Sequence, residues 1–291
     1  MIAEYLGRRV TAGATIMAIA FGMGLPATNA AEWSDTSIGW RYGTKFGEPF
    51  EGNDIHKNIV DLQHASGYKY GTNFFNVDLL MSDSKDPANG GGAGGNGAAG
   101  AQEAYVVYRN YLSMGKITGT EYRFGPVRDI GATFGFDWNT KNDGYGSRKR
   151  MLVGGPTLSI DVPGFLNVSV YALGESNAPN GIDGRYYYKT HPMLDINWSI
   201  PFGDSPFSFR GYLDYIGAKG TNEFGGGTVP ETHADVAIMM DVGRVAGGPK
   251  NTFQLGLEYE YWRNKFGNDH KGPAGDGAFA KTPMVRAEYH F

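Results

Sequence analysis

The sequence predicts an all-β protein, an antiparallel transmembrane β-barrel of about 12 strands of the bacterial outer-membrane type. Three observations lead to this prediction. The 291 residues include 45 Gly, 18 Tyr and 17 Phe, a composition that suits strands and turns. Apolar and polar side chains alternate over repeated segments of about ten residues, as in strands with two different faces. After residue 30 no stretch approaches the roughly 18 apolar residues of a membrane-spanning helix.

The N-terminus has the pattern of a secretory signal. Arg8 and Arg9 precede an apolar stretch over 10–25, and a segment of small residues follows it. This order predicts a signal peptide over residues 1–30, with residues 31–291 forming a single barrel domain. A short membrane anchor is the alternative, although glycines interrupt an apolar run that is barely long enough to span a bilayer.

Charge and reactive residues exclude several classes of function. The formal net charge of −4 provides no basic field, so nucleic acid is not expected as a partner. The absence of cysteine excludes disulfides and thiolate metal sites, and we expect neither a metal nor a cofactor. No serine stands in a nucleophile-elbow context, and His191 and His233 are simpler to interpret as polar lumen groups than as catalytic bases. We therefore do not expect an enzyme.

The expected strands follow one another with short and long connections. Their ranges are 34–46, 56–66, 69–81, 103–114, 127–138, 149–162, 166–175, 185–200, 207–219, 232–243, 251–264 and 282–291. An even count is what a single-chain barrel with both ends in the periplasm requires. The second and fourth segments do not fix which face points inward. The Gly-rich residues 82–101 cannot pack, and we expect them to form a mobile external loop.

The two faces are clearest in the first, fifth and last segments. Side chains expected to face lipid there are Ile38, Trp40, Tyr42, Ile130, Ala132, Phe134, Phe136, Trp138, Val285, Ala287, Tyr289 and Phe291. The segment 185–200 alternates in the same way over sixteen residues, which is longer than a strand of a soluble protein needs to be. A soluble β-sandwich remains the rival architecture, because a single amphipathic strand fits either fold.

Charged and aromatic side chains are expected together on the inward face. The ionisable candidates for contact with a solute are Arg41, Lys45, Asp78, Arg185, Arg210 and Glu258. The aromatic candidates are Phe46, Phe74, Tyr171, Tyr187, Tyr212 and Trp262. Acids and bases that face each other would brace the wall and narrow the pore. Rings beside such charges would suit a small solute with a flat apolar part and a hydroxyl-rich part.

Three segments resemble the Tsx-like nucleoside-specific outer-membrane channels, a family that includes OmpK-type phage receptors. They are WSDTSIGWRYGTKFGEPF, GYKYGTNFFNVDLLMSD and KITGTEYRFGPVRDIGATFGF, beginning at residues 33, 67 and 116. The likeness in order and spacing extends over most of the chain after residue 30. It departs at the Gly-rich insert 89–101 and in the external loops.

The resemblance implies a twelve-stranded monomeric barrel in the outer membrane of a Gram-negative bacterium, surrounded by lipid. Its narrow lumen would pass nucleosides or deoxynucleosides by diffusion. The segment Lys45-Phe46-Gly47-Glu48-Pro49 stands where the family carries a nucleoside-binding phenylalanine, so the resemblance points to Phe46. It also implies that the assembly machinery recognises Phe291. The alternative is a structural barrel or surface receptor, of the phage or colicin type, whose lumen is blocked by ion pairs.

Overall fold

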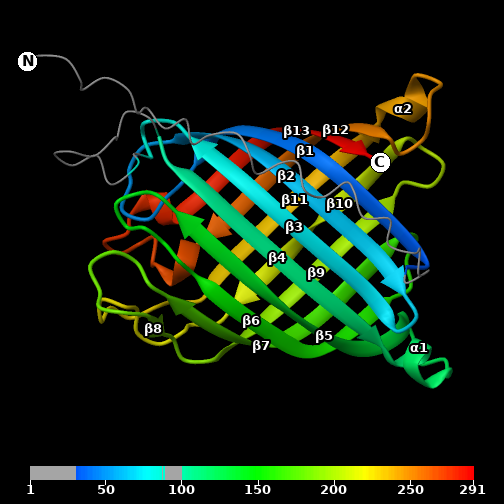
Figure 1. Ribbon diagram of the computed structural model, residues 1–291, viewed down its shortest axis with the longest axis horizontal. Coiled ribbons are helices and arrows are strands. Elements are labelled where there is room, and N and C mark those ends of the chain that lie inside the picture. The colour runs from blue at the N-terminus through cyan, green and yellow to red at the C-terminus, as the bar shows by residue number, and fades with distance from the viewer. Residues whose placement is uncertain (1–30, 87, 89–99) are drawn as a thin grey trace, which may run out of the picture. The chain divides into compact units, whose positions relative to one another are not determined.

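The computed structural model describes residues 31–86, 88 and 100–291, and it is a closed antiparallel β-barrel (Figure 1). Twelve long strands each pair with their neighbours in sequence, and the first pairs with the last to close the sheet. This confirms the predicted fold class. The predicted signal peptide and residues 87 and 89–99 of the predicted mobile loop lie outside the described residues. Within the described part of the chain, no helix is long and apolar enough to cross a membrane.

The twelve long strands correspond to the twelve predicted segments. They are β1 (Trp33–Phe46), β2 (Ile55–Tyr68), β3 (Gly71–Ser82), β4 (Gln102–Ser113), β5 (Val127–Lys141), β6 (Arg150–Ile160), β7 (Phe165–Asn177), β9 (His191–Pro201), β10 (Phe207–Ile216), β11 (Glu231–Asp241), β12 (Phe253–Arg263) and β13 (Phe279–His290). A short strand, β8 (Tyr186–Tyr187), pairs only with the end of β7. The short helices are α1 (Met114–Thr118), α2 (Val242–Val245), η3 (Lys265–Gly267) and η4 (Asp276–Ala278).

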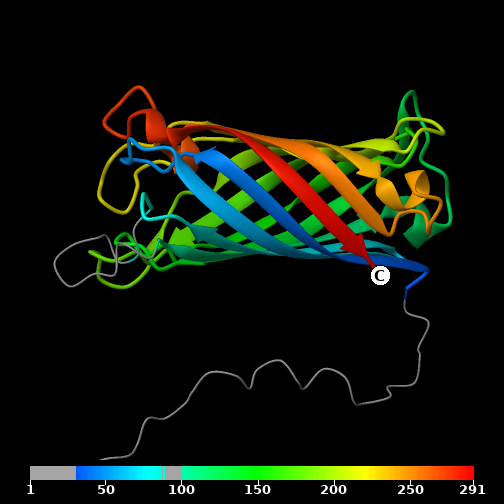
Figure 2. The same ribbon diagram turned by 90° about the horizontal axis from the view of Figure 1, so that it is seen from above.

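The barrel has two different ends, which Figures 1 and 2 show at its right and left. The terminal end carries the start of β1, the C-terminus, both α-helices and the tight turns at 69–70 and 161–164. The loop end carries the long connections, among them 217–230 and 264–278. Because bacterial barrels keep short turns in the periplasm and long loops outside, the loop end faces the exterior of the cell.

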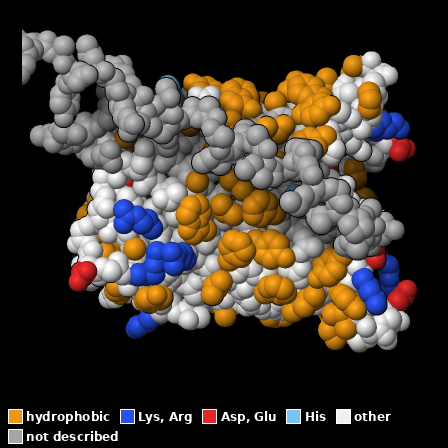
Figure 3. All heavy atoms as spheres, viewed as in Figure 1, with side chains coloured by type: hydrophobic (Ala, Val, Ile, Leu, Met, Phe, Trp, Pro, Cys, Tyr) orange, Lys and Arg blue, Asp and Glu red, His pale blue; other side chains and the backbone are white. Residues whose placement is uncertain are grey.

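Side chains alternate between an apolar outer face and a charged inner face. Leu257 on the outside is 70% exposed, whereas the inward carboxylate of Asp61 is fully buried. Figure 3 shows apolar side chains spread over the visible wall between the two ends, with charged side chains near the ends. A soluble protein arranges these residue types the other way round. The predicted faces of the first, fifth and last strands agree with this arrangement.

The structure fixes the two strands whose orientation the sequence left open. On β2, Lys57, Ile59 and Asp61 point inward, and on β4, Tyr105 lies directly opposite the inward Asp78 of β3. The predicted strand 185–200 is wrong as one element. The backbone N–H groups of residues 188 and 189 donate to carbonyls of Glu175 and Lys219 instead, which separates β8 from β9.

Apolar side chains also fill parts of the lumen. One cluster near the loop end joins Phe46, Ile55, Ile59 and Met284. A second, on the β6–β7–β9 wall, joins Val153, Tyr171, Leu173 and Met193. Buried apolar area stabilises a barrel as it does a soluble core. The lumen is therefore a packed interior between these walls, and not a wide water-filled pore.

Candidate functional site in the barrel lumen

Arg41 of β1 is the centre of an ion-pair network across one wall of the lumen. Its guanidinium lies 2.5 Å from Asp78 Oδ1, 3.3 Å from Glu258 Oε1 and 3.4 Å from Asp61 Oδ1. These partners come from β3, β12 and β2, so one side chain ties together strands from both ends of the sequence. Charges buried in this way are tolerated only when they are paired and hydrogen-bonded.

The same network continues toward the terminal end. Arg286 on β13 lies 2.8 Å from Glu258 Oε2 and 2.6 Å from Glu288 Oε1. Glu288 also accepts a 3.0 Å hydrogen bond from Arg210 on β10 and lies 3.2 Å from His290 Nε2. Acids and bases alternate along this wall, which holds the strands together and leaves little room beside it.

The opposite wall carries carboxyl groups that tyrosines contact. Arg109 on β4 forms a short ion pair with Asp137 on β5, and Tyr105 donates a 3.2 Å hydrogen bond to the same carboxylate. Tyr171 donates to Asp195 over 3.4 Å. Asn197 donates a further hydrogen bond to Asp195 over 2.6 Å, so among the described residues this carboxyl group is held by neutral donors alone.

An aromatic group lies on β10, β11 and β12. The His233 and Trp262 rings stack at 3.9 Å between centroids, and Tyr212 packs edge-on against His233 at 5.1 Å. Three buried polar atoms beside these rings have no hydrogen-bond partner among the described residues: Trp262 Nε1, Glu260 Oε1 and Asp214 Oδ1. Flat rings beside an unused donor and unused acceptors are what a small ring-bearing polar solute requires.

Three lysines surround one carboxylate at the loop end. Glu48 Oε1 lies 2.7 Å from Lys57 Nζ, 3.2 Å from Lys265 Nζ and 3.5 Å from Lys141 Nζ. Burial opposes ionisation of Glu48, but the ammonium groups of Lys141, Lys265 and Lys57 outweigh this effect and hold its pKa well below the usual range. Glu48 is therefore an anion at any pH near neutral.

A second lysine–carboxylate cluster lies beside the first. Both oxygens of Glu175 are 2.8 Å from Lys219 Nζ, and Lys149 Nζ lies 3.3 Å from Oε1. Aromatic faces cover these ammonium groups: Lys149 is 3.9 Å from the centroid of Phe266, and Lys219 is 4.5 Å from that of Tyr188. Cation–π contacts of this kind hold charged groups where water is scarce.

Nine of the twelve predicted site residues share the inward face. They are Arg41, Phe46, Phe74, Asp78, Tyr171, Arg210, Tyr212, Glu258 and Trp262. They do not converge on one point. Phe46 is packed in an apolar cluster at the loop end, whereas Phe74 lies near the turn at the terminal end. Their contact with a solute stays a prediction.

The inward orientation predicted for the other three residues is wrong. A register shift between Gly43 and Phe46 turns Phe46 inward and leaves Lys45 exposed. Tyr187 lies on β8 at the loop end and is 72% exposed. Arg185 precedes β8 and donates to the carbonyl of Arg148 over 2.9 Å. Tyr187 and Arg185 were predicted to face inward because residues 185–200 were expected to form one strand, which the structure divides into β8 and β9.

Sequence reasoning missed the lysines around Glu48. Lys57 lies on a strand of undecided orientation, and Lys265 was expected in an external loop. The turn that carries Lys265 inward has two non-glycine residues in the left-handed region, Asn264 at φ 56° and Phe266 at φ 60°. No alternation signals such a turn, so only the identity of Asn264, which tolerates this region, could have hinted at it.

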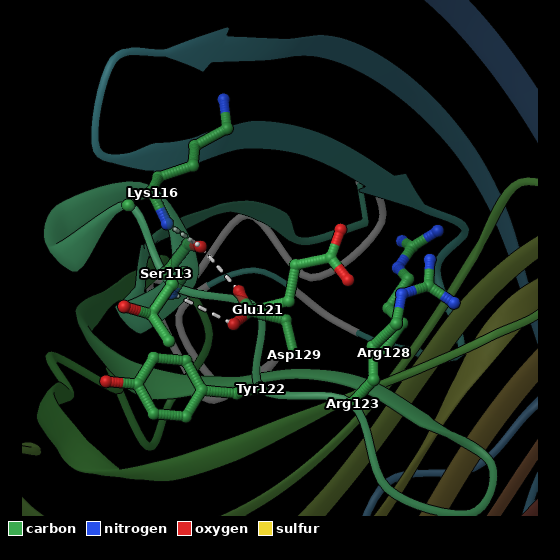
Figure 4. A pocket seen from close by; sticks show the side chains of 10 residues that line it. Ser113, Lys116, Glu121, Tyr122, Arg123, Arg128 and Asp129 are labelled. Carbon is green, nitrogen blue, oxygen red and sulfur yellow. Dashed lines mark hydrogen bonds between the residues drawn. The ribbon is translucent and has the colours of Figure 1, made fainter.

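A surface pocket of about 330 Å³ opens at the terminal end, between α1 and the start of β5. Figure 4 shows its charged and aromatic side chains, namely Lys116, Glu121, Tyr122, Arg123, Arg128 and Asp129. Asp129 accepts hydrogen bonds from Ser113 and from the backbone of Gly115. Arg123 is 3.0 Å from Asp161, so part of the basic charge at the pocket is already compensated.

The apolar exterior, the charged interior and the closed sheet define a β-barrel protein of the bacterial outer membrane. No protein-family model matches the chain, and no curated protein matches it. Among solved structures it is similar to the KdgM porin, with 13% identity, a TM-score of 0.43, and coverage of 88% of this chain and 99% of that chain.

Two further structures are similar to the chain. OpdK of Pseudomonas aeruginosa with vanillate has 11% identity and a TM-score of 0.39, covering 90% of this chain and 99% of that chain. The translocator domain of the autotransporter NalP from Neisseria meningitidis has 13% identity and a TM-score of 0.39, covering 89% and 88%. Structures of such low identity do not indicate what this chain binds. The solute must be inferred from the side chains of this lumen.

Proposed function

We propose that the protein is a substrate-selective diffusion channel, and that its solutes are nucleosides or deoxynucleosides. The observation that carries this proposal is the aromatic group on β10–β12, whose stacked rings lie beside an unused donor and unused acceptors. A base can stack on such rings, while a sugar provides the hydroxyl groups that carboxylates bind.

Selectivity follows from how closely the lumen is packed. The network around Arg41 and the lysines around Glu48 occupy the space that a general porin would leave open to water. A solute can pass only where it replaces contacts that the wall already makes, so affinity for the wall decides what crosses.

The resemblance to the Tsx-like family supports the choice of nucleosides. It points to Phe46, yet that ring is buried against Ile55 and Ile59 below Lys57. Trp262 and Tyr212 are therefore the residues on which the proposal depends more strongly. We further propose that the barrel is a monomer and that the assembly machinery recognises Phe291.

The test is single-channel conductance of the folded chain in a planar bilayer, with adenosine and thymidine added in steps. Nucleosides should reduce a small conductance. Trp262→Leu should raise the concentration needed for half-block by about tenfold, since stacking on an aromatic side chain contributes about 1–3 kcal/mol per base. Trp198→Leu is the matched control, because Trp198 lies on the outer face of β9. A large conductance indifferent to nucleosides contradicts the proposal.

A surface receptor or structural barrel is the second candidate. The ion pairs that fill the lumen favour it, since a wall so closely packed can serve rigidity alone. Phage or colicins would then be the partners, bound by the long connections of the loop end. This candidate predicts no conductance in the same bilayer experiment, whatever solute is added.

A further inference from the structure

We propose that the three lysines around Glu48 form a binding site for an anionic group of the solute, which Glu48 occupies in the absence of solute. The anionic group is a carboxylate or phosphate attached to a flat ring. This inference goes beyond the proposed channel, on which it rests, because it adds ring-bearing anions to the uncharged nucleosides as a second class of solute.

The three ammonium groups converge from separate parts of the fold onto one oxygen atom. Lys57 comes from β2, Lys141 from the end of β5 and Lys265 from the turn after β12. All three Nζ atoms lie within 3.5 Å of Glu48 Oε1. Three donors around one oxygen are the arrangement that binds an oxyanion by charge-assisted hydrogen bonds.

Two of these lysines depend on Glu48 for their charge balance. In the described part of the chain, the next carboxylate oxygen to Lys57 is that of Asp86 at 4.0 Å, and the other hydrogen bond of Lys265 Nζ goes to the carbonyl of Gly47 at 2.9 Å. The side chains of Lys57 and Lys265 are only 3% and 4% exposed. Without Glu48, Lys265 would be buried without a carboxylate partner and Lys57 would keep only the 4.0 Å contact with Asp86, which strongly favours binding of another anion.

The local charges favour exchange over addition of a second anion. Lys141 also pairs with Asp86 at 2.9 Å and Asp143 at 3.0 Å, so the three lysines face three carboxylates when Glu48 is included. Glu103 is a further carboxylate nearby, hydrogen-bonded to Asn139. An incoming anion is therefore accommodated when the Glu48 side chain swings away.

The exchange requires movement of the Glu48 side chain alone. Its backbone is pinned to the 264–278 connection, where the N–H of Phe50 donates to the carbonyl of Ala274 over 2.9 Å. A Cβ on Gly277 would lie 2.1 Å from the carbonyl oxygen of Glu48, so only glycine permits this approach. The backbone of Glu48 is therefore held in place independently of where its side chain points.

Aromatic rings beside the lysines define the rest of the ligand. Lys265 Nζ lies 4.6 Å from the centroid of Trp262 and 5.2 Å from that of Phe266. A solute whose acidic group contacts Lys265 therefore places an attached ring next to both aromatic side chains. This favours ring-bearing anions over small inorganic ones.

The experiment measures binding of benzoate and of inorganic phosphate to the detergent-folded protein by tryptophan fluorescence. Glu48→Gln removes the competing carboxylate, and we expect both probes to bind at least about tenfold more tightly than to the wild type. Glu51→Gln is the matched control, since Glu51 lies in the same connection and its carboxylate binds Asn53. Equal affinities in both variants overturn the proposal.

Two further variants make the result specific. Lys265→Met combined with Glu48→Gln should abolish the gain, and a gain that survives overturns the lysine site. Glu48→Asp keeps the charge on a shorter side chain, so it should bind the probes with intermediate affinity even if Glu48→Gln does not fold. Benzoate should bind more tightly than phosphate, and the reverse order contradicts the role of the aromatic rings.

Conductance of the same samples separates this inference from the channel proposal. Tighter anion binding with no conductance in any variant would support the lysine site and reject the channel. Conductance blocked by nucleosides, without the gain in anion binding, would support the channel and reject the lysine site.

Discussion

The ion pairs inside the lumen and those at the terminal end have the same chemistry but different surroundings. Arg41 and Glu258 form a buried pair on one wall of the lumen, whereas Arg123 and Asp161 form a 3.0 Å pair with side chains that are 56% and 53% exposed. Water and salt screen the exposed pair, and its net stabilisation is small. Water cannot solvate either charge of the buried pair, so removal of one residue leaves the other as an unpaired buried charge.

This difference shows what holds the barrel together from within. A soluble protein would fill its interior with apolar side chains, but here charged groups from neighbouring strands of the sheet make many of the contacts on the inner face. The price is that removing one member leaves several unpaired charges. Substitutions in the two regions test whether burial, and not the ion pair as such, determines the loss of stability.

The largest effect is expected for Arg41→Met. The substitution leaves Asp61, Asp78 and Glu258 without their shared guanidinium, and breaking a buried pair costs about 3–5 kcal/mol. Urea unfolding in lipid vesicles, followed by tryptophan fluorescence, measures the change in the free energy of unfolding. A loss no greater than that of Arg123→Met would contradict the comparison.

Asp129→Ala tests a partly buried carboxylate at the terminal end itself. Asp129 accepts hydrogen bonds from Tyr111 at 2.9 Å, from the N–H of Gly115 at 3.1 Å and from Ser113. Leaving such donors unsatisfied should lower the free energy of unfolding by about 1–3 kcal/mol. Asp129→Asn retains an acceptor and should lose less. Equal unfolding curves for the alanine variant and the wild type would show that burial matters less than proposed.

The pH dependence of stability tests Glu48. Its folded-state pKa lies well below the ordinary value of 4.5, so its stabilising contribution is fully present above about pH 4.5 and is lost as pH falls through the folded pKa. Each unit of lowering corresponds to about 1.4 kcal/mol. Unfolding measured from pH 7 to 3 should show a smaller acid loss in Glu48→Gln than in the wild type. Parallel pH profiles would exclude an ionised, stabilising Glu48.

The smallest effect is expected for Arg123→Ala. Exposed pairs contribute about 0–1 kcal/mol, and the loss should fall within that range and disappear at high salt. The same urea series at low and high ionic strength provides the measurement. A loss of several kcal/mol, insensitive to salt, would remove the distinction between the two regions.

The strands and most inward faces could be predicted from the sequence because alternation is a local signal. It placed Arg286 and Glu288 opposite Val285 and Ala287, as the structure has them. Alternation failed as a guide where the backbone departs from regular extension. This happens at the register shift before Phe46 and at the interruption between β8 and β9 before His191. The lysine site could not be predicted from the sequence, because Lys57, Lys141 and Lys265 meet only when the barrel closes.

The barrel closes by pairing of β1 with β13, so closure must follow synthesis of both strands. The N–H of Phe291 donates to the carbonyl of Thr36 over 2.9 Å, and His290 contacts Asp35 at a separation of 255 residues. The first strand therefore has no partner along one edge until β13 has been synthesised. Contacts so distant along the chain form slowly, and an open edge invites pairing with other chains.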